Sequence, residues 1–390
     1  MTSELAANAP QPIAAPISAT LPVMTLVVKL GSSIVADDLG EVRAEVLDSI
    51  CGQVAELKRS GEDVVMVTSG AIARGIRIMA LGRRPTAMDE LQAASAVGQG
   101  DLFQAYEQRL ADRNVRAAQV LLTLSDVSER AHYLNARQTL ERLLMWDVVP
   151  VINENDTTST DEITFGDNDF LAALVSVLLR ARLLVLLTNT EGVFTADPRT
   201  VEGAEMLTSI DSAEDFARVE IGAASRFGRG GMGSKIASAR IASESGVPVV
   251  VCSGMREASL EAAAKGEQIG TRFGPQTERT ISPYKLWLKY AKQPTGTLYV
   301  DAGAAAKLRE SGSSLLPVGI VESGGAFKAG DAVEVIEVTD EKVKALVGKG
   351  ITEFGTFEVD RILGRKSDYL REHFPDAPAE VIHRDRFVLL

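Results

Sequence analysis

The chain has 390 residues, of which 45% are hydrophobic and 24% are charged, and its formal net charge is −12. This size and apolar content predict at least two domains with buried cores. The acidic balance argues against broad nucleic-acid binding, which needs surplus Lys and Arg, and no apolar run reaches membrane-spanning length. Residues 1–22 are rich in Ala and Pro and contain no Lys or Arg. We therefore predict a disordered tail that lacks the basic start of a targeting peptide, and a cytoplasmic location.

The first predicted strand is a short apolar run, residues 23–28, that ends at Lys29. Glycine at position 31 leaves backbone N–H groups free to approach a phosphate, and the lysine supplies the point charge that a transferring phosphoryl group requires. The alternative is a lysine that extends its stem from a strand end toward water. This segment alone leaves both interpretations open.

A similar arrangement recurs at residues 64–67, where an apolar run is followed by Thr68-Ser69-Gly70-Ala71 and then by a helical pattern. Backbone donors at a helix start suit a carboxylate or a phosphate. Ser69 is therefore a candidate ligand-binding residue, although an ordinary helix N-cap explains a serine in this position equally well.

The third predicted strand, residues 148–152, leads into Asn-Glu-Asn-Asp at 153–156. After a Thr- and Ser-rich loop, Gly166 precedes an Asp-Asn-Asp run at 167–169 and an apolar helix pattern over 170–179. Helix capping explains one of these polar residues but does not need all three. Two carboxylates and an amide at one helix start indicate binding of an ammonium group, orientation of lysines, or coordination of magnesium through water.

The fourth segment is Gly-Arg-Gly-Gly-Met-Gly-Ser-Lys at 228–235, ahead of a helix that is predicted to run through Ala242. Its spacing and the order of Lys and Ser differ from the P-loop pattern G-x-x-x-x-G-K-[ST]. A flexible linker is the alternative, although a linker seldom ends in a lysine at a helix start, where phosphates bind well. Together the four segments predict a phosphate-handling site without a P-loop.

Up to about residue 272, apolar strands alternate with longer helical patterns, which is typical of an α/β protein with a mainly parallel sheet. The predicted strands lie at Met24, Val64, Ala118, Val148, Leu183 and Pro248. We assign residues 23–273 to this domain and residues 274–293, which show no clear period, to a connector. Residues 294–390 predict a small β-rich module. Its expected strands are 296–300, 318–322, 332–338, 344–346 and 387–390. Cys51 and Cys252 lie in apolar patterns and predict buried thiols.

Nearly everything after residue 22 resembles the glutamate 5-kinases of the amino-acid kinase family, which phosphorylate the side-chain carboxylate of L-glutamate with ATP in the first step of proline biosynthesis. The resemblance implies an α/β fold with a mainly parallel sheet sandwiched by helices. It gives the catalytic residues as Lys29, Lys235 and Asp169, of which the lysines embrace the phosphates and the acid orients them. It gives glutamate binding to Ser69, Asp156 and Asn168, and we add Asp167 from its place at the same helix start. The expected nucleotide-binding residues are Lys29, Thr188, Asn189, Arg229, Gly230, Gly231, Met232, Gly233, Ser234 and Lys235.

Two positions depart from the family pattern: Asn189 stands where Asp is usual beside the nucleotide, and Arg229 where Thr is common. Asn keeps the shape of Asp and loses its charge, so we expect an effect on nucleotide affinity more than on catalysis. Magnesium is expected to enter with ATP, held mainly by phosphates and water. The resemblance also implies feedback inhibition by proline, with loop 156–166 as the candidate site. It further implies a dimer or tetramer, and a glutamyl phosphate reductase is a plausible partner.

The C-terminal module resembles the PUA domain through residues 312–320 and 327–331. Such domains often bind RNA, but this segment is nearly neutral, which favours a structural or regulatory role. Three other interpretations stay open: a related kinase for aspartate, N-acetylglutamate, carbamate or UMP, an RNA-binding protein, and a catalytically silent relative. An ammonium site at Asp156 and Asn168 would separate glutamate from its acetylated form.

Overall fold

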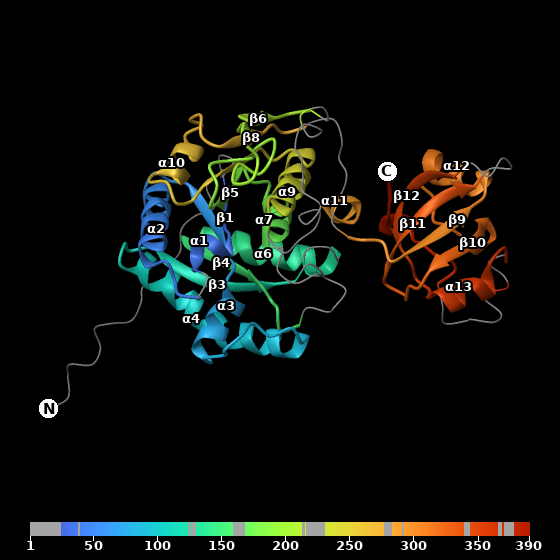
Figure 1. Ribbon diagram of the computed structural model, residues 1–390, viewed down its shortest axis with the longest axis horizontal. Helices are drawn as coiled ribbons and strands as arrows, with labels where there is room; N and C mark the ends of the chain where they lie inside the picture. Colours follow the sequence, from blue (N-terminus) through green and yellow to red (C-terminus); the bar gives the residue numbers. More distant parts are fainter. Residues whose placement is uncertain are drawn as a thin grey trace, which may run out of the picture.

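The computed structural model describes residues 25–37, 40–123, 126, 130–158, 168–212, 215, 231–276, 283–290, 292–338, 344–365, 369 and 378–390. The predicted N-terminal tail and three candidate site residues, Asp167, Arg229 and Gly230, lie outside this part of the chain. Most of the candidate proline loop does as well. The described elements form an eight-stranded and a five-stranded sheet, which Figure 1 shows in separate lobes.

The eight-stranded sheet has the order β3-β4-β2-β1-β5-β7-β8-β6, and its pairings are parallel except for that between β7 and β8. The prediction of a mainly parallel sheet is therefore confirmed. The strands are β1 (Thr25–Leu30), β2 (Asp63–Val67), β3 (Arg116–Leu122), β4 (Val148–Glu154), β5 (Leu183–Thr188), β6 (Ser209–Ile210), β7 (Val249–Ser253) and β8 (Thr271–Phe273). β6 and β8 were not predicted because they are too short to show a period.

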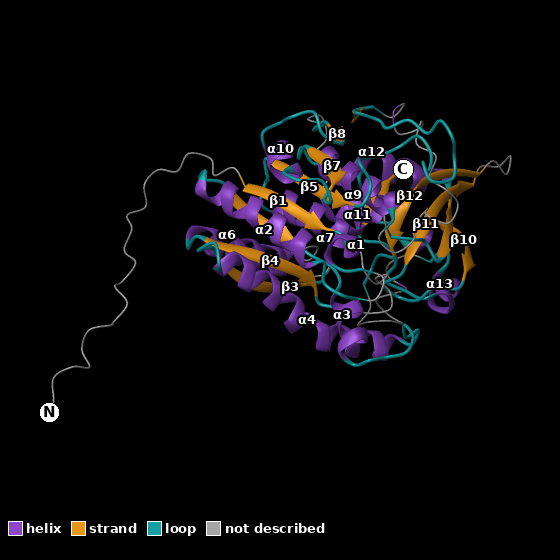
Figure 2. Cartoon of the chain, turned by 60° about the vertical axis from the view of Figure 1, so that its left-hand side comes forward, coloured by secondary structure: helices purple, strands orange, loops and turns teal. Residues whose placement is uncertain are grey.

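Helices cover both faces of this sheet and run alongside its strands (Figure 2). Helices α2, α4 and α10 pack on one face, and α6, α7 and α9 pack on the other. The helices are α1 (Ser32–Val35), α2 (Ala44–Arg59), α3 (Ala71–Ile78), α4 (Met88–Ala111), α6 (Arg130–Met145), α7 (Asn168–Leu178), α9 (Met232–Glu244) and α10 (Ser259–Ala264). The sandwich expected from the sequence is thus observed.

The alternation of side chains along β1 decides which helices Lys29 contacts. Leu26 and Val28 belong to the core under α2 and α4, whereas Val27 belongs to the core under α7 and α9. Successive side chains of a strand point to opposite faces. Lys29 therefore shares the face of Val27 and is directed toward α7 and α9.

Helices α3 and α4 are in very close contact. A Cβ atom at Gly98 would lie 1.9 Å from the carbonyl oxygen of Ala71, and one at Gly75 would lie 1.7 Å from that of Ala94. Only glycine allows the two backbones to approach this far. The position of α4 is therefore fixed against α3, which begins at the end of β2.

The second sheet has the order β10-β9-β11-β12-β13. Its elements are β9 (Gly296–Val300), α12 (Ala302–Ser311), η2 (Pro317–Gly319), β10 (Ile320–Gly325), β11 (Ala332–Val338), β12 (Lys344–Ile351), α13 (Thr356–Ile362), η3 (Arg384–Arg386) and β13 (Phe387–Leu389). The five predicted strands are present, but the one expected from residue 318 starts as a short 3-10 helix, and β12 continues well beyond residue 346. The β-rich module is confirmed.

The segment assigned to the connector contains helix α11 (Pro283–Tyr290). Leu288 of α11 is buried in a cluster with residues of the second sheet, and α11 also contacts α7 and α9 of the first domain. Figure 1 shows it between the lobes. The buried Lys349 ammonium donates to the carbonyl oxygens of Lys289 at 3.2 Å and Lys292 at 2.9 Å. This contact satisfies the Lys289 carbonyl in the last turn of α11 and the Lys292 carbonyl beyond it, and it ties the end of the helix to β12.

Candidate active site

The candidate residues gather at the carboxyl ends of the central strands. In register, Lys29 of β1 lies opposite Val67 of β2 and Leu186 of β5. Ser69 follows β2, and Thr188 ends β5. Because β1 pairs on one side with β2 and on the other with β5, the strand order reverses at β1, which is where open α/β sheets bind ligands.

The centre of the site is a buried carboxylate between two lysines. The Lys29 ammonium lies 2.6 Å from Oδ1 of Asp169, and the Lys235 ammonium lies 3.0 Å from Oδ2. The Ser234 hydroxyl donates to the same Oδ2 at 3.3 Å. Asp169 is fully buried, and both lysines are nearly so. Two cations separated widely in the sequence thus converge on one point.

The charge of this carboxylate is maintained despite its burial. Burial raises the pKa of Asp169, but the attraction of the Lys29 and Lys235 ammonium groups lowers it by more, so its pKa lies below the usual range. The cluster therefore combines two ammonium groups with a single carboxylate. Its net positive charge suits a polyanion such as a nucleotide phosphate chain.

Two helix starts bring Asp169 and Lys235 together. Asp169 lies in the first turn of α7 and Lys235 in the first turn of α9, and these helices pack against each other. Gly231 is the N-cap of α9 and offers no side chain to cap the N–H groups of the first turn. Met232 and Gly233 follow within that turn. The partial positive charge at this helix start adds to that of the lysines.

A second polar group lies at the end of β4. Asp156 is buried and accepts a hydrogen bond of 2.5 Å from the Ser95 hydroxyl of α4. Burial raises the pKa of Asp156, although the Ser95 hydrogen bond and the charge of Arg84 oppose the rise. Asn168 accepts a hydrogen bond of 3.0 Å from the backbone N–H of Glu154, which fixes its amide beside Asp169.

The α4 contacts with this polar group were missed in the sequence. Asn153 donates from Nδ2 to Oε1 of Gln99 at 2.6 Å, and Ser95 lies one helical turn before Gln99. Neither residue belongs to a motif, and both lie far from β4 in sequence. β4 also runs two residues further than predicted, so Asn153 is part of the strand and not of the following loop.

The remaining candidates occupy the rim of the same edge. Ser69 is half-buried, and it is not the N-cap of α3, because that position belongs to Gly70, whose φ of +113° requires glycine. The capping explanation for Ser69 is therefore wrong. Thr188 is buried, whereas Asn189 is exposed and accepts a hydrogen bond of 3.4 Å from the Thr188 hydroxyl.

The two cysteines and the histidines form no site in the described chain. Cys51 and Cys252 are free and buried, as predicted. Burial raises the pKa of each thiol to about 12, so both stay protonated at neutral pH. No group of three or more His, Cys, Asp or Glu that could hold a metal ion occurs among the described residues. Likewise, no helix in the described ranges has the length and apolar character needed to cross a membrane.

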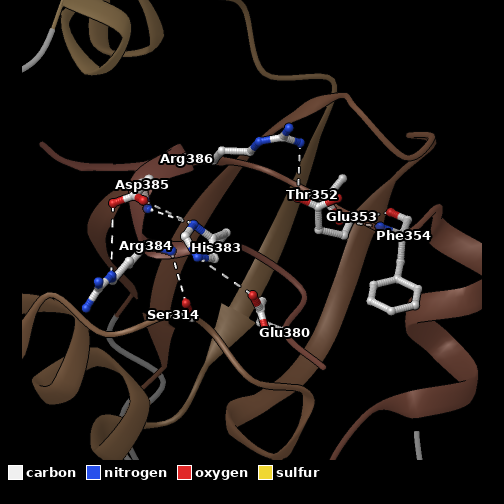
Figure 3. A network of polar contacts seen from close by, with 9 residues as sticks. All are labelled: Ser314, Thr352, Glu353, Phe354, Glu380, His383, Arg384, Asp385 and Arg386. Carbon is white, nitrogen blue, oxygen red and sulfur yellow. Dashed lines mark hydrogen bonds and ion pairs between the residues drawn. The ribbon is translucent and has the colours of Figure 1, made fainter. Parts of the chain in front are cut away.

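Basic residues near the C-terminus are engaged by neighbouring acids, as Figure 3 shows. The Arg386 guanidinium lies 3.1 Å from the Glu353 carboxylate, and Arg384 lies 4.0 Å from Asp385. His383 accepts a hydrogen bond of 3.2 Å from the backbone N–H of Asp385. The two arginine charges of this network are thus matched by the carboxylates of Glu353 and Asp385.

Comparison with known families agrees with this architecture. The model of the amino acid kinase family matches residues 24–253, and that of the PUA domain matches residues 296–374. The chain belongs to the amino acid kinase family and carries a C-terminal PUA domain.

Full-length relatives define the branch of the family. The chain is 43% identical to the glutamate 5-kinase of Paraburkholderia xenovorans, over 94% of this chain and 97% of the relative. It is 42% identical to the glutamate 5-kinase of Chromohalobacter salexigens, over 94% and 96%. Among solved structures, a UMP kinase from Bacillus anthracis matches 66% of this chain and 98% of its own, with 16% identity and a TM-score of 0.46. The full-length matches place the chain in the glutamate 5-kinase branch.

Proposed function

We propose that the protein transfers the γ-phosphoryl group of ATP to the side-chain carboxylate of L-glutamate, giving L-glutamyl 5-phosphate and ADP in the first step of proline biosynthesis. The observation that carries this proposal is the cluster of Lys29, Asp169 and Lys235, because it concentrates positive charge at the switch point of a parallel sheet. The glutamate 5-kinase relatives, which match along nearly their whole length, support the same reaction.

The main obstacle to this reaction is repulsion between two anions. A carboxylate oxygen forms a bond to the γ-phosphorus while the bond from phosphorus to the β,γ-bridging oxygen breaks, and ADP carries away the electron pair. The Lys29 and Lys235 ammonium groups would offset the negative charge on both reactants and on the leaving phosphate. No general base is needed, because the glutamate side chain is already ionised at neutral pH.

Asp169 would act as a positioning residue for the lysines. Both of its oxygens are engaged, one with each ammonium group, so it is poorly placed to bind a metal ion directly. Magnesium would then arrive with ATP, held mainly by phosphate oxygens and water, and would supply further positive charge. Thr188, Asn189 and the start of α9 would contact the nucleotide.

The polar group at the end of β4 would recognise the amino-acid part of the substrate. Asp156 supplies a buried carboxylate for the substrate ammonium group, and Asn168 and Ser69 supply polar contacts near it. An acetylated amine would lose its charge and its fit to Asp156. This arrangement favours free glutamate over N-acetylglutamate.

A hydroxylamine trap tests the proposal. The purified protein is incubated with ATP, magnesium and hydroxylamine, and with glutamate, N-acetylglutamate, aspartate or UMP as the acceptor. We expect hydroxamate with glutamate, little with the other carboxylates, and no ADP release with UMP. Hydroxamate formation from N-acetylglutamate or aspartate in preference to glutamate would refute the assignment, as would an inactive protein. Filter binding with tRNA, which we expect to be weak, tests the RNA-binding alternative.

We also propose that proline inhibits this reaction at or beside the glutamate site. Proline carries the same α-carboxylate and a cationic amine, so Asp156 could hold it in place of glutamate. Inhibition that is competitive with glutamate at millimolar proline is the expected result. Activity that is unchanged at that concentration would refute inhibition by proline.

A further inference from the structure

Helix α4 makes two side-chain contacts with the end of β4, one helical turn apart. Ser95 donates to Oδ2 of Asp156 at 2.5 Å, and Gln99 accepts from Nδ2 of Asn153 at 2.6 Å. Residues four apart lie on the same helix face, about 5–6 Å from each other. Asp156 and Asn153 are therefore held side by side along one edge of α4.

Asn153 has an oxygen without a partner. The residue is 2% exposed, and Oδ1 has no hydrogen-bond partner within the part of the chain that the structure describes. In the structure, Nδ2 of Asn153 is directed toward Gln99 Oε1 of α4, and Oδ1 is left as an acceptor. A buried acceptor without a donor is costly, so a donor from a ligand would stabilise it.

We infer that Ser95 and Gln99 are positioning residues that set the specificity of the kinase for an acceptor with a free amino group. By orienting the Asp156 carboxylate and the Asn153 amide oxygen, they present two acceptors to one ammonium group. This inference rests on the proposed function and deepens it. Neither α4 residue has to touch the substrate for this role.

The backbone contact between α3 and α4 explains why α4 can act in this way. Gly98 lies between the two positioning residues and meets α3 without an intervening side chain. The helix therefore cannot move toward or away from β4 without breaking this contact. Arg84, on the loop before α4, is the charged side chain that acts on Asp156 in the described ranges.

The test measures kinetics of Ser95→Ala, Ser95→Thr and Gln99→Leu with glutamate, with ATP, and with glutarate, which has both carboxylates and no amine. We expect Ser95→Ala and Gln99→Leu to raise KM for glutamate by about tenfold, the loss typical of a hydrogen bond to a charged group. KM for ATP and kcat/KM for glutarate should stay within about twofold. Ser95→Thr keeps the hydroxyl and should restore the glutamate KM. Gln104→Leu, on an exposed face of α4, is the matched control.

A pH profile separates positioning from general damage. The Ser95 hydroxyl stabilises the ionised form of Asp156, so its removal should raise the pKa of that carboxylate. As the pH is lowered, KM for glutamate should therefore start to increase at a higher pH in Ser95→Ala than in the wild type. Equal losses with glutarate or ATP, or a glutamate KM unchanged in both variants, would overturn the inference. If Ser95→Ala does not fold, Gln99→Leu still decides between these outcomes. A wild-type protein without glutamate-dependent activity would refute the proposed function itself.

Discussion

Asp169→Asn tests the central cluster most sharply, because it keeps the side-chain shape and removes the charge. At an effective dielectric constant of 20, the contacts at 2.6 Å and 3.0 Å each correspond to roughly 6 kcal/mol of attraction. Desolvation offsets much of this, at several kcal/mol per ion. The measured cost of leaving a buried charge without its partner is about 3–5 kcal/mol, and we expect a loss of unfolding free energy in that range.

The pH dependence of the same variant has a definite sign. The pKa of Asp169 is lowered in the folded protein, so its contribution to stability is fully present above the unfolded value of about 4. That contribution is lost as the pH falls through the folded pKa. Below pH 4 the wild type should therefore lose stability faster than Asp169→Asn, until the two converge.

The assay is urea unfolding followed by circular dichroism, without nucleotide, at pH 7 and at lower pH. Turnover of Asp169→Asn should fall by about a hundredfold or more, because the lysines lose the anion that orients them. Asp197→Asn, which breaks an exposed pair with Arg199, should leave turnover unchanged. A variant at Asp169 with the wild-type unfolding midpoint and near-normal turnover would refute the reasoning.

Three further predictions concern other parts of the chain. Asp156→Asn should raise KM for glutamate by about ten- to hundredfold with little change in KM for ATP, because it removes the charge facing the ammonium group. In steady-state kinetics, an equal rise in KM for both substrates would mean that Asp156 is misassigned. Gly98→Ala should cost about 1–3 kcal/mol in urea unfolding, because its Cβ would meet the Ala71 carbonyl at 1.9 Å. Gly100→Ala, on the same helix with nothing within 4 Å, should instead be neutral or stabilising by up to about 1 kcal/mol, and a similar loss in both variants would contradict the close contact. Lys349→Met should cost about 1–3 kcal/mol in the same assay, because the carbonyls of Lys289 and Lys292 lose their donor. An unchanged unfolding midpoint would show that this contact is dispensable.

The sheet and the meeting of Lys29, Asp169 and Lys235 at one edge could be predicted because strand ends and helix starts are marked in the sequence. Lys29 and Ser69 each follow an apolar run, and parallel strands bring such ends to one edge. Lys235 and Asp169 stand at helix starts, where the side chains of two packed helices can meet. In these cases local pattern and topology together determine which residues are neighbours.

The parts that could not be predicted depend on packing between distant elements. Ser95 and Gln99 lie within a long helix and carry no motif, and their role follows only from how closely α4 approaches β4. Helix α11 lies in the segment that we assign to the connector, and it could not be predicted because its eight residues are too few to show a period. Its place follows from packing against elements of both domains. The β6 and β8 strands are too short to show alternation.

The proposed role of the two lysines is tested most directly by measuring glutamate-dependent release of ADP by the wild type, Lys29→Met and Lys235→Met. We predict that the wild type consumes ATP only when glutamate is present, and that each substitution lowers kcat by about a hundred- to a thousandfold, the loss typical of one donor to developing charge. Lys265→Met, at an exposed lysine, should match the wild type. Turnover of either active-site variant within a few-fold of the wild type would contradict the claim that these two ammonium groups bring the anionic reactants together.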